Sequence, residues 1–298
     1  MITLFPTPDT TAMVRTVNPK QWGRQREGYP PGGPADKFSA SVAARLAGNS
    51  ENEPLFEIIQ SRGQLQPIEE EICIALSGAH LRLSCDGRSL ELNQSYLLPA
   101  SSTLQWEPKA SNLGYRSYLA LGQSKEKRYR KPWKDIYSWC PPKQVVRILE
   151  GPETTEKTLD YLMREQWQIS PQSNNQGIRL YSAAATPSLP SIPSAPVLDG
   201  TVQLTPTGPI ILMRERQTVG GYPRIAQVID CDIDMLAQYQ PNQWFRFEAI
   251  RFKDAQYLNE LQQQQQQAAI IGIHSKCQGG LTFDENIKLA IKRIVIQL

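Results

Sequence analysis

Alternation of apolar and polar residues constrains the fold of this chain more than any other feature. Successive side chains of an extended strand point to opposite faces, so a period of two predicts half-buried strands. Turn residues separate these runs. The expected strands are residues 72–76, 81–85, 90–92, 96–98, 103–106, 115–121, 145–149, 210–213, 225–229, 244–252 and 293–297. Many short strands without alternating long helices favour a sandwich or a barrel over a parallel α/β sheet.

One hairpin and a few short helices complete the expected secondary structure. Asp86-Gly87 lies between alternating leucines, which is the strongest short-range signal for a two-residue hairpin turn. Apolar residues at helical spacing predict helices over 38–46 and 155–167, and a third from Asp254 into the six-glutamine run 262–267. We interpret their apolar stripes as core packing and the glutamine run as a frayed helix end or an exposed loop.

The chain length indicates how many domains to expect. At about 150 residues per domain, 298 residues suggest two domains or one large β architecture. A basic, aromatic stretch at 123–142 has no clear periodicity and ends in Pro141-Pro142, so it is interpreted as a connector. The predicted fold class is therefore mainly β, with two barrel-like halves, residues 1–142 and 143–298, and a few short helices.

Charge and composition exclude several classes of protein. Lys and Arg number 32 against 29 Asp and Glu, a formal net charge of +3, which argues against a nucleic-acid or membrane-surface binder. No run of about 18 apolar residues is present, so no transmembrane helix is expected. The N-terminus has neither a basic nor an apolar signal region, and the five cysteines are widely spaced. We therefore expect a cytoplasmic protein with reduced thiols.

Scarce histidine and missing nucleotide motifs limit the possible chemistry. With only two histidines, His80 and His274, neither a histidine-based zinc site nor a Ser-His-Asp triad is expected, and we predict no metal. The chain has no GxxxxGK[ST] and no GxGxxG motif, so any ATP used in its reaction would be bound elsewhere. A site would have to be built from backbone amides, arginine, carboxylates and side-chain amides.

Clusters of such groups give the candidate site residues. Gly32-Gly33 permits close backbone approach to a ligand, and Asp36 is placed to cap the helix that follows. Arg216 offers a planar forked donor, and Gln217 offers both a donor and an acceptor for a planar amide or carboxylate. Further candidates for substrate binding are polar or glycine residues in two loops: Gln172, Ser173, Thr218, Gly220, Gly221 and Tyr222. Taken singly, each cluster is equally consistent with an ordinary turn.

The order of these motifs resembles one known family. Gly28-Tyr29-Pro30-Pro31-Gly32-Gly33-Pro34-Ala35-Asp36 is followed much later by Arg216-Gln217-Thr218-Val219-Gly220-Gly221-Tyr222-Pro223. This pair is similar to the biotin-dependent carboxyltransferase A/B domain family. That family includes the C subunit of 5-oxoprolinase (PxpC), Kip-antagonist (KipA) proteins, proteins like the second component of allophanate hydrolase, and part of urea carboxylase. The resemblance implies a mostly β protein with cyclophilin-like barrel character.

The resemblance also implies a function and partners. The expected function is that of one component of an ATP-dependent 5-oxoprolinase complex that opens 5-oxo-L-proline to L-glutamate, inactive alone. The implied partners are a KipI-like protein, which is the B subunit of such a complex, and a homologue of its A subunit. Arg216, Gln217 and the Gly220-Gly221 amides would stabilise charge developing on oxygen, with Asp36 and Gln172 opposite.

Two alternatives to an enzyme component of this kind stay open. One is a KipA-type regulator that binds a KipI-like partner without catalysis. It is favoured because Asn174-Asn175-Gln176 stands where the family tends to have Asp, Arg and Met. The other is a biotin-dependent amide or urea carboxyltransferase component, which is weaker because the chain has no biotinylated domain.

Overall fold

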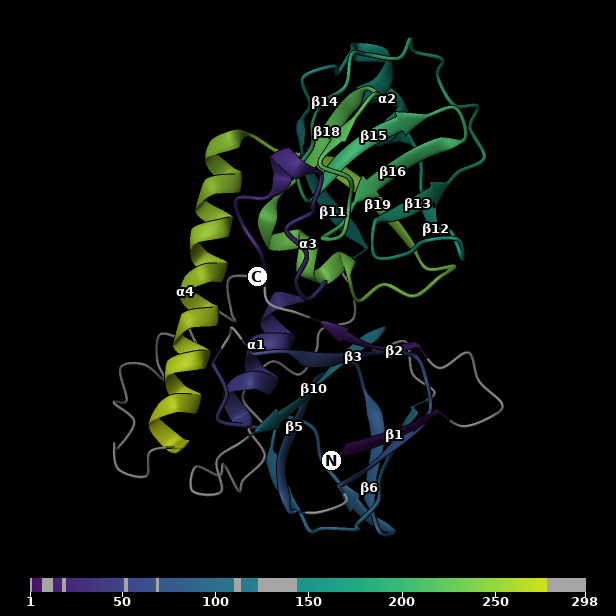
Figure 1. Ribbon diagram of the computed structural model, residues 1–298. Helices are drawn as coiled ribbons and strands as arrows, with labels where there is room; N and C mark the ends of the chain where they lie inside the picture. Colours follow the sequence, from purple (N-terminus) through teal and green to yellow (C-terminus); the bar gives the residue numbers. More distant parts are fainter. Residues whose placement is uncertain are drawn as a thin grey trace. The chain divides into compact units, whose positions relative to one another are not determined.

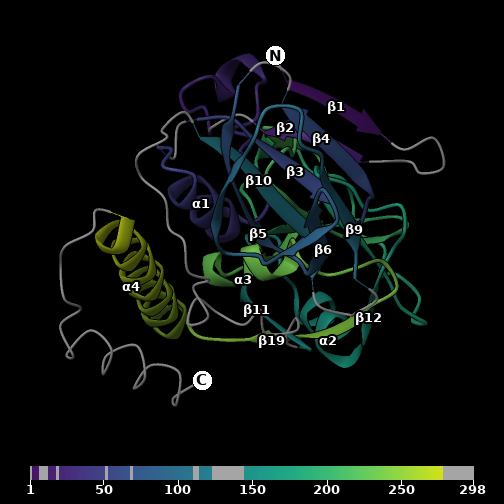
Figure 2. The same cartoon turned by 90° about the horizontal axis from the view of Figure 1, so that it is seen from below.

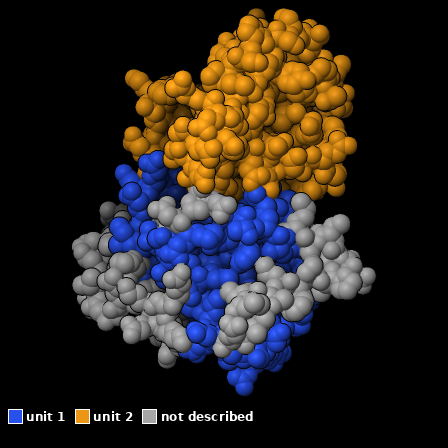
Figure 3. All heavy atoms as spheres, viewed as in Figure 1, with its two compact units in different colours: residues 1–19, 37–140, 261–298 blue, residues 20–36, 141–260 orange. Residues whose placement is uncertain are grey.

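The structure is a computed structural model that describes residues 2–6, 13–17, 20–50, 53–67, 70–109, 114–122 and 144–277 (Figure 1). Its contacts form two compact units, which Figure 3 colours separately. Unit 1 comprises residues 1–19, 37–140 and 261–298, and unit 2 comprises residues 20–36 and 141–260. The division into domains 1–142 and 143–298 stays a prediction, because a compact unit need not be an independently folding domain.

Unit 1 contains two antiparallel five-stranded sheets with a shared apolar core. The first has the order β1 (Ile2–Pro6), β4 (Gly63–Pro67), β9 (Leu104–Pro108), β6 (Leu81–Cys85) and β7 (Arg88–Leu90). The second has the order β2 (Met13–Val17), β3 (Leu55–Ile59), β10 (Arg116–Gly122), β5 (Ile72–Gly78) and β8 (Ser95–Leu98). Leu65 and Leu104 of the first sheet pack in one cluster with Ile74 and Leu119 of the second.

The predicted hairpin at Asp86-Gly87 is confirmed. Strands β6 and β7 pair with Cys85 opposite Arg88, which leaves a two-residue loop between them. Asp86 has φ of 47° and Gly87 has φ of 79°, and positive φ at both central positions matches the twist of the flanking strands.

Unit 2 is a closed seven-stranded barrel. Its strands follow the order β11 (Val145–Glu150), β18 (Arg224–Val228), β15 (Thr201–Thr205), β16 (Gly208–Leu212), β13 (Gly177–Tyr181), β12 (Trp167–Ile169) and β19 (Trp244–Ala249). The parallel pair β11–β19 closes it, and Figure 2 shows both strands with β12 from below. Trp167, Phe245 and Phe247 fill the interior. A short pair, β14 (Ala195–Pro196) and β17 (Val219–Gly220), is added outside the barrel.

The mainly β class and its barrel are confirmed, with one difference between the two units. Unit 2 closes into a barrel, whereas the strands described in unit 1 form two separate sheets. The predicted strand at 293–297 and the whole predicted connector at 123–142 lie outside the described residues.

The helices agree with the sequence except at the glutamine run and at the end of the helix predicted over 155–167, where Trp167 belongs to β12. Helix α1 spans Lys37–Leu46, and α2 spans Glu156–Arg164 with Thr155 as its N-cap. A short 3₁₀ helix, η1 (Gln25–Glu27), and α3 (Asp230–Leu236) were not expected. Helix α4 runs over Phe252–Cys277, so the glutamine run lies inside a 26-residue helix. The prediction of a frayed end or loop is wrong because glutamine is a good helix former.

Among the described residues, no helix combines the length and the apolar character needed to cross a membrane.

Candidate functional site

Asp199 is the centre of a group of charged side chains within unit 2. Its carboxylate accepts hydrogen bonds from Arg214 Nη1 at 2.7 Å and Arg216 Nη1 at 2.5 Å, and Lys20 Nζ lies 3.3 Å away. Arg214 Nη2 also donates to Asp234 at 3.0 Å. We call these five residues the Asp199 cluster. They come from three loop segments and from α3, so the barrel brings together charges that are distant in sequence.

Local backbone geometry explains why the two arginines meet Asp199. Strand β16 ends at Leu212, and the turn that follows is fixed by a hydrogen bond from Arg216 N to Met213 O. On the other side Gly200 has φ of 83°, and a Cβ there would lie 2.8 Å from Gln227 Nε2. Glycine is therefore required immediately after Asp199, where Gly200 N donates to Leu212 O.

The cluster carries a surplus of positive charge in a buried setting. Burial alone would raise the pKa of Asp199, but Arg214, Arg216 and Lys20 outweigh it and hold that pKa below its usual value. Burial lowers the pKa of Arg216, and neighbouring Arg214 lowers it further in spite of Asp199. Three cations face two carboxylates, which favours binding of an additional anion.

One donor of Arg216 is still available. Its Nε donates to Val197 O at 3.1 Å and its Nη1 to Asp199. Within the part of the chain that the structure describes, Nη2 of Arg216 makes no hydrogen bond, although the side chain is only 6% exposed. A carboxylate or an oxyanion would satisfy this donor.

A chain of side-chain amides begins at Gln217, the residue that follows Arg216. Gln217 Nε2 donates to Gln203 Oε1 at 3.1 Å, and Gln203 Nε2 donates to Tyr222 O at 3.2 Å. Gly220 lies directly beside Gln203, because a Cβ at Gly220 would be 2.5 Å from Gln203 Nε2. Gln217, Gly220 and Tyr222 therefore meet at Gln203, and their role in binding stays a prediction.

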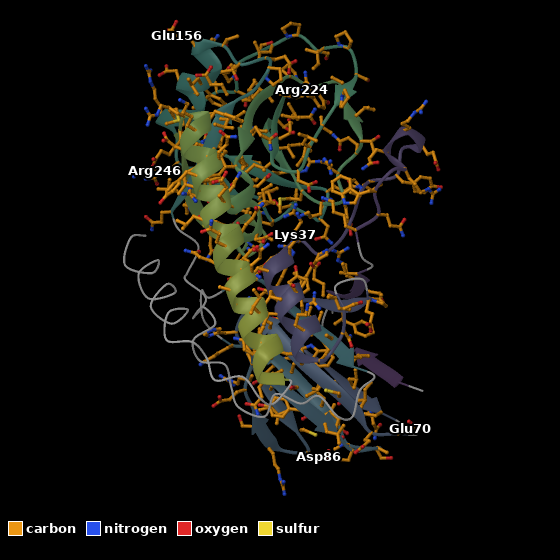
Figure 4. The ribbon with its side chains drawn as sticks, turned by 90° about the vertical axis from the view of Figure 1, so that its left-hand side faces the viewer. Lys37, Glu70, Asp86, Glu156, Arg224 and Arg246 are labelled. Atoms are coloured by element: carbon orange, nitrogen blue, oxygen red, sulfur yellow. The ribbon has the colours of Figure 1, made fainter. Side chains whose placement is uncertain are left out.

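The rest of this loop is held by a neighbouring segment. Val197 N donates to Thr218 O at 3.2 Å, and Ile192 N donates to Gly221 O at 2.9 Å. Arg224, labelled in Figure 4, fixes the end of the loop through an ion pair of 2.6 Å with Glu153. Burial and hydrogen bonding thus leave the side chains of Gln217, Val219 and Tyr222 exposed.

The Gly32-Gly33 loop, the first glycine pair predicted for the site, packs against Lys20 of the Asp199 cluster. Gly32 and Gly33 have φ of 65° and 93°, as expected for a loop that needs glycine. A Cβ on Gly33 would lie 3.4 Å from Lys20 Cβ, so the loop packs against the stem of that lysine. Asp36 is buried and accepts a hydrogen bond of 2.7 Å from Gln238 Nε2. Its role as a helix cap stays a prediction.

Gln172 and Ser173 belong to a separate hydrogen-bond network. Gln172 N donates to Ser170 Oγ, and Ser173 Oγ accepts from Arg179 N. Among the described residues their hydrogen bonds stay within residues 170–179. The loop meets the arginine segment through its backbone, since Glu215 N donates to Asn175 O. The structure does not bring the side chains of Gln172 and Ser173 into the Asp199 cluster.

Four residues of the cluster were missed from the sequence: Lys20, Asp199, Arg214 and Asp234. Arg214 and Arg216, two residues apart after a strand, are a signal that some carboxylate must lie nearby. Asp199 and Lys20 are 17 and 196 residues from Arg216, so only the folded barrel identifies them as partners. No group of three or more His, Cys, Asp and Glu suited to a metal occurs in the described part of the chain.

Residues 27–128 and 121–249 match the family described as carboxyltransferase domain, subdomain A and B. The chain belongs to this family. The match includes the Gly32-Gly33 loop, Asp199 and both arginines, so most of the candidate site lies in the shared region. Lys20 lies just before the matched residues.

Curated relatives in this carboxyltransferase family include two proteins of the same name, the C subunit of 5-oxoprolinase. The protein from Haemophilus influenzae is 26% identical over 79% of this chain and 87% of its own length. The protein from Escherichia coli is 28% identical over 78% of this chain and 87% of its own length.

A solved structure supports the fold. The urea amidolyase of Kluyveromyces lactis is similar with a TM-score of 0.72 at 19% identity, over 91% of this chain. This chain spans only 20% of that longer protein. At this identity the likeness concerns the carboxyltransferase fold alone.

Proposed function

We propose that this chain is one component of a 5-oxoprolinase complex that opens 5-oxo-L-proline to L-glutamate with consumption of ATP. The names of the two curated relatives support the proposal, and both matches cover more than three quarters of this chain. The observation that carries it is the free Nη2 of Arg216, which lies in a cationic cluster and one residue before the glutamine amide chain.

The substrate's functional groups complement this arrangement. 5-Oxoproline has a carboxylate, which would bind Arg216 Nη2 within the surplus positive charge around Asp199. Its ring amide has one donor and one acceptor, and Gln217 can pair with both kinds of group. As the ring opens, negative charge develops on the lactam oxygen, and Gln217 would stabilise it.

The proposal requires partner proteins. The chain has no phosphate-binding motif, so ATP would be bound elsewhere in the complex, by a homologue of the A subunit or by the KipI-like B subunit. We therefore expect the purified chain to have neither ATPase nor 5-oxoprolinase activity, and to form a stable hetero-complex with the KipI-like protein.

A regulatory role is the second candidate, and one contact favours it. Asn174 Oδ1 accepts from Gln176 N at 2.9 Å and from Gly177 N at 3.2 Å. The residues that replace the family's Asp and Arg therefore form a local turn. A KipA-type protein that binds a KipI-like partner would not need those charges.

Reconstitution separates the two candidates. The chain is co-expressed with homologues of the A and B subunits from the same genome, and glutamate is measured with 5-oxo-L-proline and ATP. The enzyme role predicts glutamate only when all three chains and ATP are present. A stable hetero-complex that produces no glutamate would support the regulatory role instead.

A further inference from the structure

We infer that Lys20 is the proton donor of this site, supplying the proton that the lactam nitrogen needs when the ring opens. This inference rests on the proposed function. It assigns a role to a residue that lies outside the motifs singled out in the sequence and before the region matched to the family.

The position of Lys20 is fixed on three sides. Its Nζ lies 3.3 Å from Asp199 Oδ2 and 4.1 Å from the centre of the Trp22 ring. Gly33 packs against its Cβ, and positive φ at Gly33 allows that approach. Gln21 N donates to Pro31 O at 2.8 Å, which holds the segment in place. The amine is therefore held in one position rather than free at the end of a long side chain.

Lys20 is the part of the cluster suited to proton transfer. Its side chain is 20% exposed, whereas those of Arg214 and Arg216 are 5% and 6% exposed. An arginine does not lose its proton under ordinary conditions, but a lysine in such surroundings can. Lys20 thus combines a fixed position with access to a ligand.

The groups facing Lys20 shift its pKa in opposite directions. Burial lowers the pKa of Lys20, Asp199 raises it, and Arg214 and Arg216 lower it again, with a net decrease. The other carboxylate of the cluster, Asp234, pairs with Arg214. A lysine whose pKa is lowered is a stronger acid, which favours transfer of its proton to the lactam nitrogen.

Every proton in the ring-opening step is accounted for. A water oxygen bonds to the lactam carbonyl carbon, and the carbon–nitrogen bond breaks with its electron pair remaining on nitrogen. That nitrogen takes a proton from Lys20 Nζ, and the proton lost by the attacking water returns to the Lys20 amine. ATP hydrolysis by the complex drives the reaction without changing this balance.

Amine labelling tests the state of Lys20 without any catalytic activity. The chain is treated with limiting acetic anhydride across a pH series, and acetylation is measured by mass spectrometry. Lys157, an exposed lysine of α2, is the internal control. We expect half-maximal labelling at a lower pH for Lys20 than for Lys157. Equal midpoints, or a higher midpoint for Lys20, would overturn the inference.

Kinetics of the reconstituted complex test the proton-donor role. Lys20→Arg keeps the positive charge but removes the titrating amine, so kcat should fall by about 100-fold while KM stays within about twofold. The wild-type kcat should decrease as the pH rises through the pKa of Lys20, and this decrease should be absent in the variant. Lys157→Arg should behave as wild type.

The possible outcomes distinguish the two proposals. An active complex whose Lys20→Arg variant keeps the wild-type kcat and pH profile would overturn the inference and leave the proposed function standing. A wild-type complex without 5-oxoprolinase activity would contradict the proposed function, and the proton-donor role with it.

Discussion

Two buried carboxylates, one in each unit, are surrounded by arginines in different ways. In unit 1, Glu57 is fully buried, accepts from Arg15 Nε at 2.7 Å and from Tyr118 OH at 2.8 Å, and has Arg116 Nε at 3.9 Å. Arg15 and Tyr118 stand directly opposite Glu57 in the pairings of β2 and β10 with β3. In unit 2, the partners of Asp199 come from turns.

We interpret the Glu57 cluster as structural and the Asp199 cluster as a binding site. Regular strand pairing fixes the partners of Glu57, so that cluster specifies the register of three strands. Loop segments position the partners of Asp199, and that cluster includes a partly exposed lysine and a free guanidinium donor. Loops on a rigid scaffold are the usual place for ligand binding. Similar charges therefore serve two purposes, and the mutations below separate them.

Glu57→Gln should have the largest effect on stability. It leaves Arg15 and Arg116 without their buried counter-charge, which costs about 3–5 kcal/mol of unfolding free energy. Urea denaturation followed by circular dichroism measures this loss. The activity per folded molecule of the complex should be unchanged, and a raised KM would contradict a purely structural role.

Asp199→Asn should affect both stability and activity. Loss of this charge leaves three cations close together and costs about 1–3 kcal/mol, less than at Glu57, because the Asp199 side chain is 11% exposed. Arg216 and Lys20 also lose their orienting partner, so kcat/KM should fall by at least about tenfold. A stability loss without any change in kcat/KM would show that the Asp199 cluster is structural, like the Glu57 cluster.

Gly220→Ala tests the amide chain with little effect on folding. The added methyl would displace the far end of the Gln203 side chain and break its hydrogen bonds to Gln217 and Tyr222 O. We expect a stability loss of about 1 kcal/mol or less and a KM raised by about 5- to 10-fold, equivalent to one hydrogen bond. Gly221→Ala is the matched control, since its Cβ would make only an ordinary contact of 3.4 Å with Ile192 O.

The smallest expected effect is on acid stability. The pKa of Asp199 is lower in the folded protein than its ordinary value, so the unfolded chain takes up this proton more readily. Asp199 makes its full contribution to the free energy of unfolding above its pKa in the unfolded chain, about 3.9. This contribution is lost as the pH falls through the pKa of Asp199 in the folded protein. The stability difference between wild type and Asp199→Asn should therefore shrink below about pH 4 in urea titrations.

The sequence predicted the fold more completely than it predicted the candidate site. Period-two runs and Asp86-Gly87 predicted strands and a hairpin because both depend on neighbouring residues. The Gly220-Gly221 loop was predicted for the same reason, and it does contain Arg216 beside Gln217. Asp199 and Lys20 could not be predicted as partners of Arg216, because only the closed barrel brings these three segments together.

A matched pair of arginine variants tests the central claim most directly. Arg216→Ala and Arg116→Ala each remove a buried arginine from one of the two clusters, and Tm and kcat/KM are measured on the same preparation of the reconstituted complex. Arg216→Ala should lower kcat/KM by about 30- to 1,000-fold, the equivalent of roughly 2–4 kcal/mol, with a small decrease in Tm. Arg116→Ala should lower Tm and leave kcat/KM near normal. A large decrease in Tm with near-normal kcat/KM for Arg216→Ala would contradict the assignment of the Asp199 cluster as the substrate site.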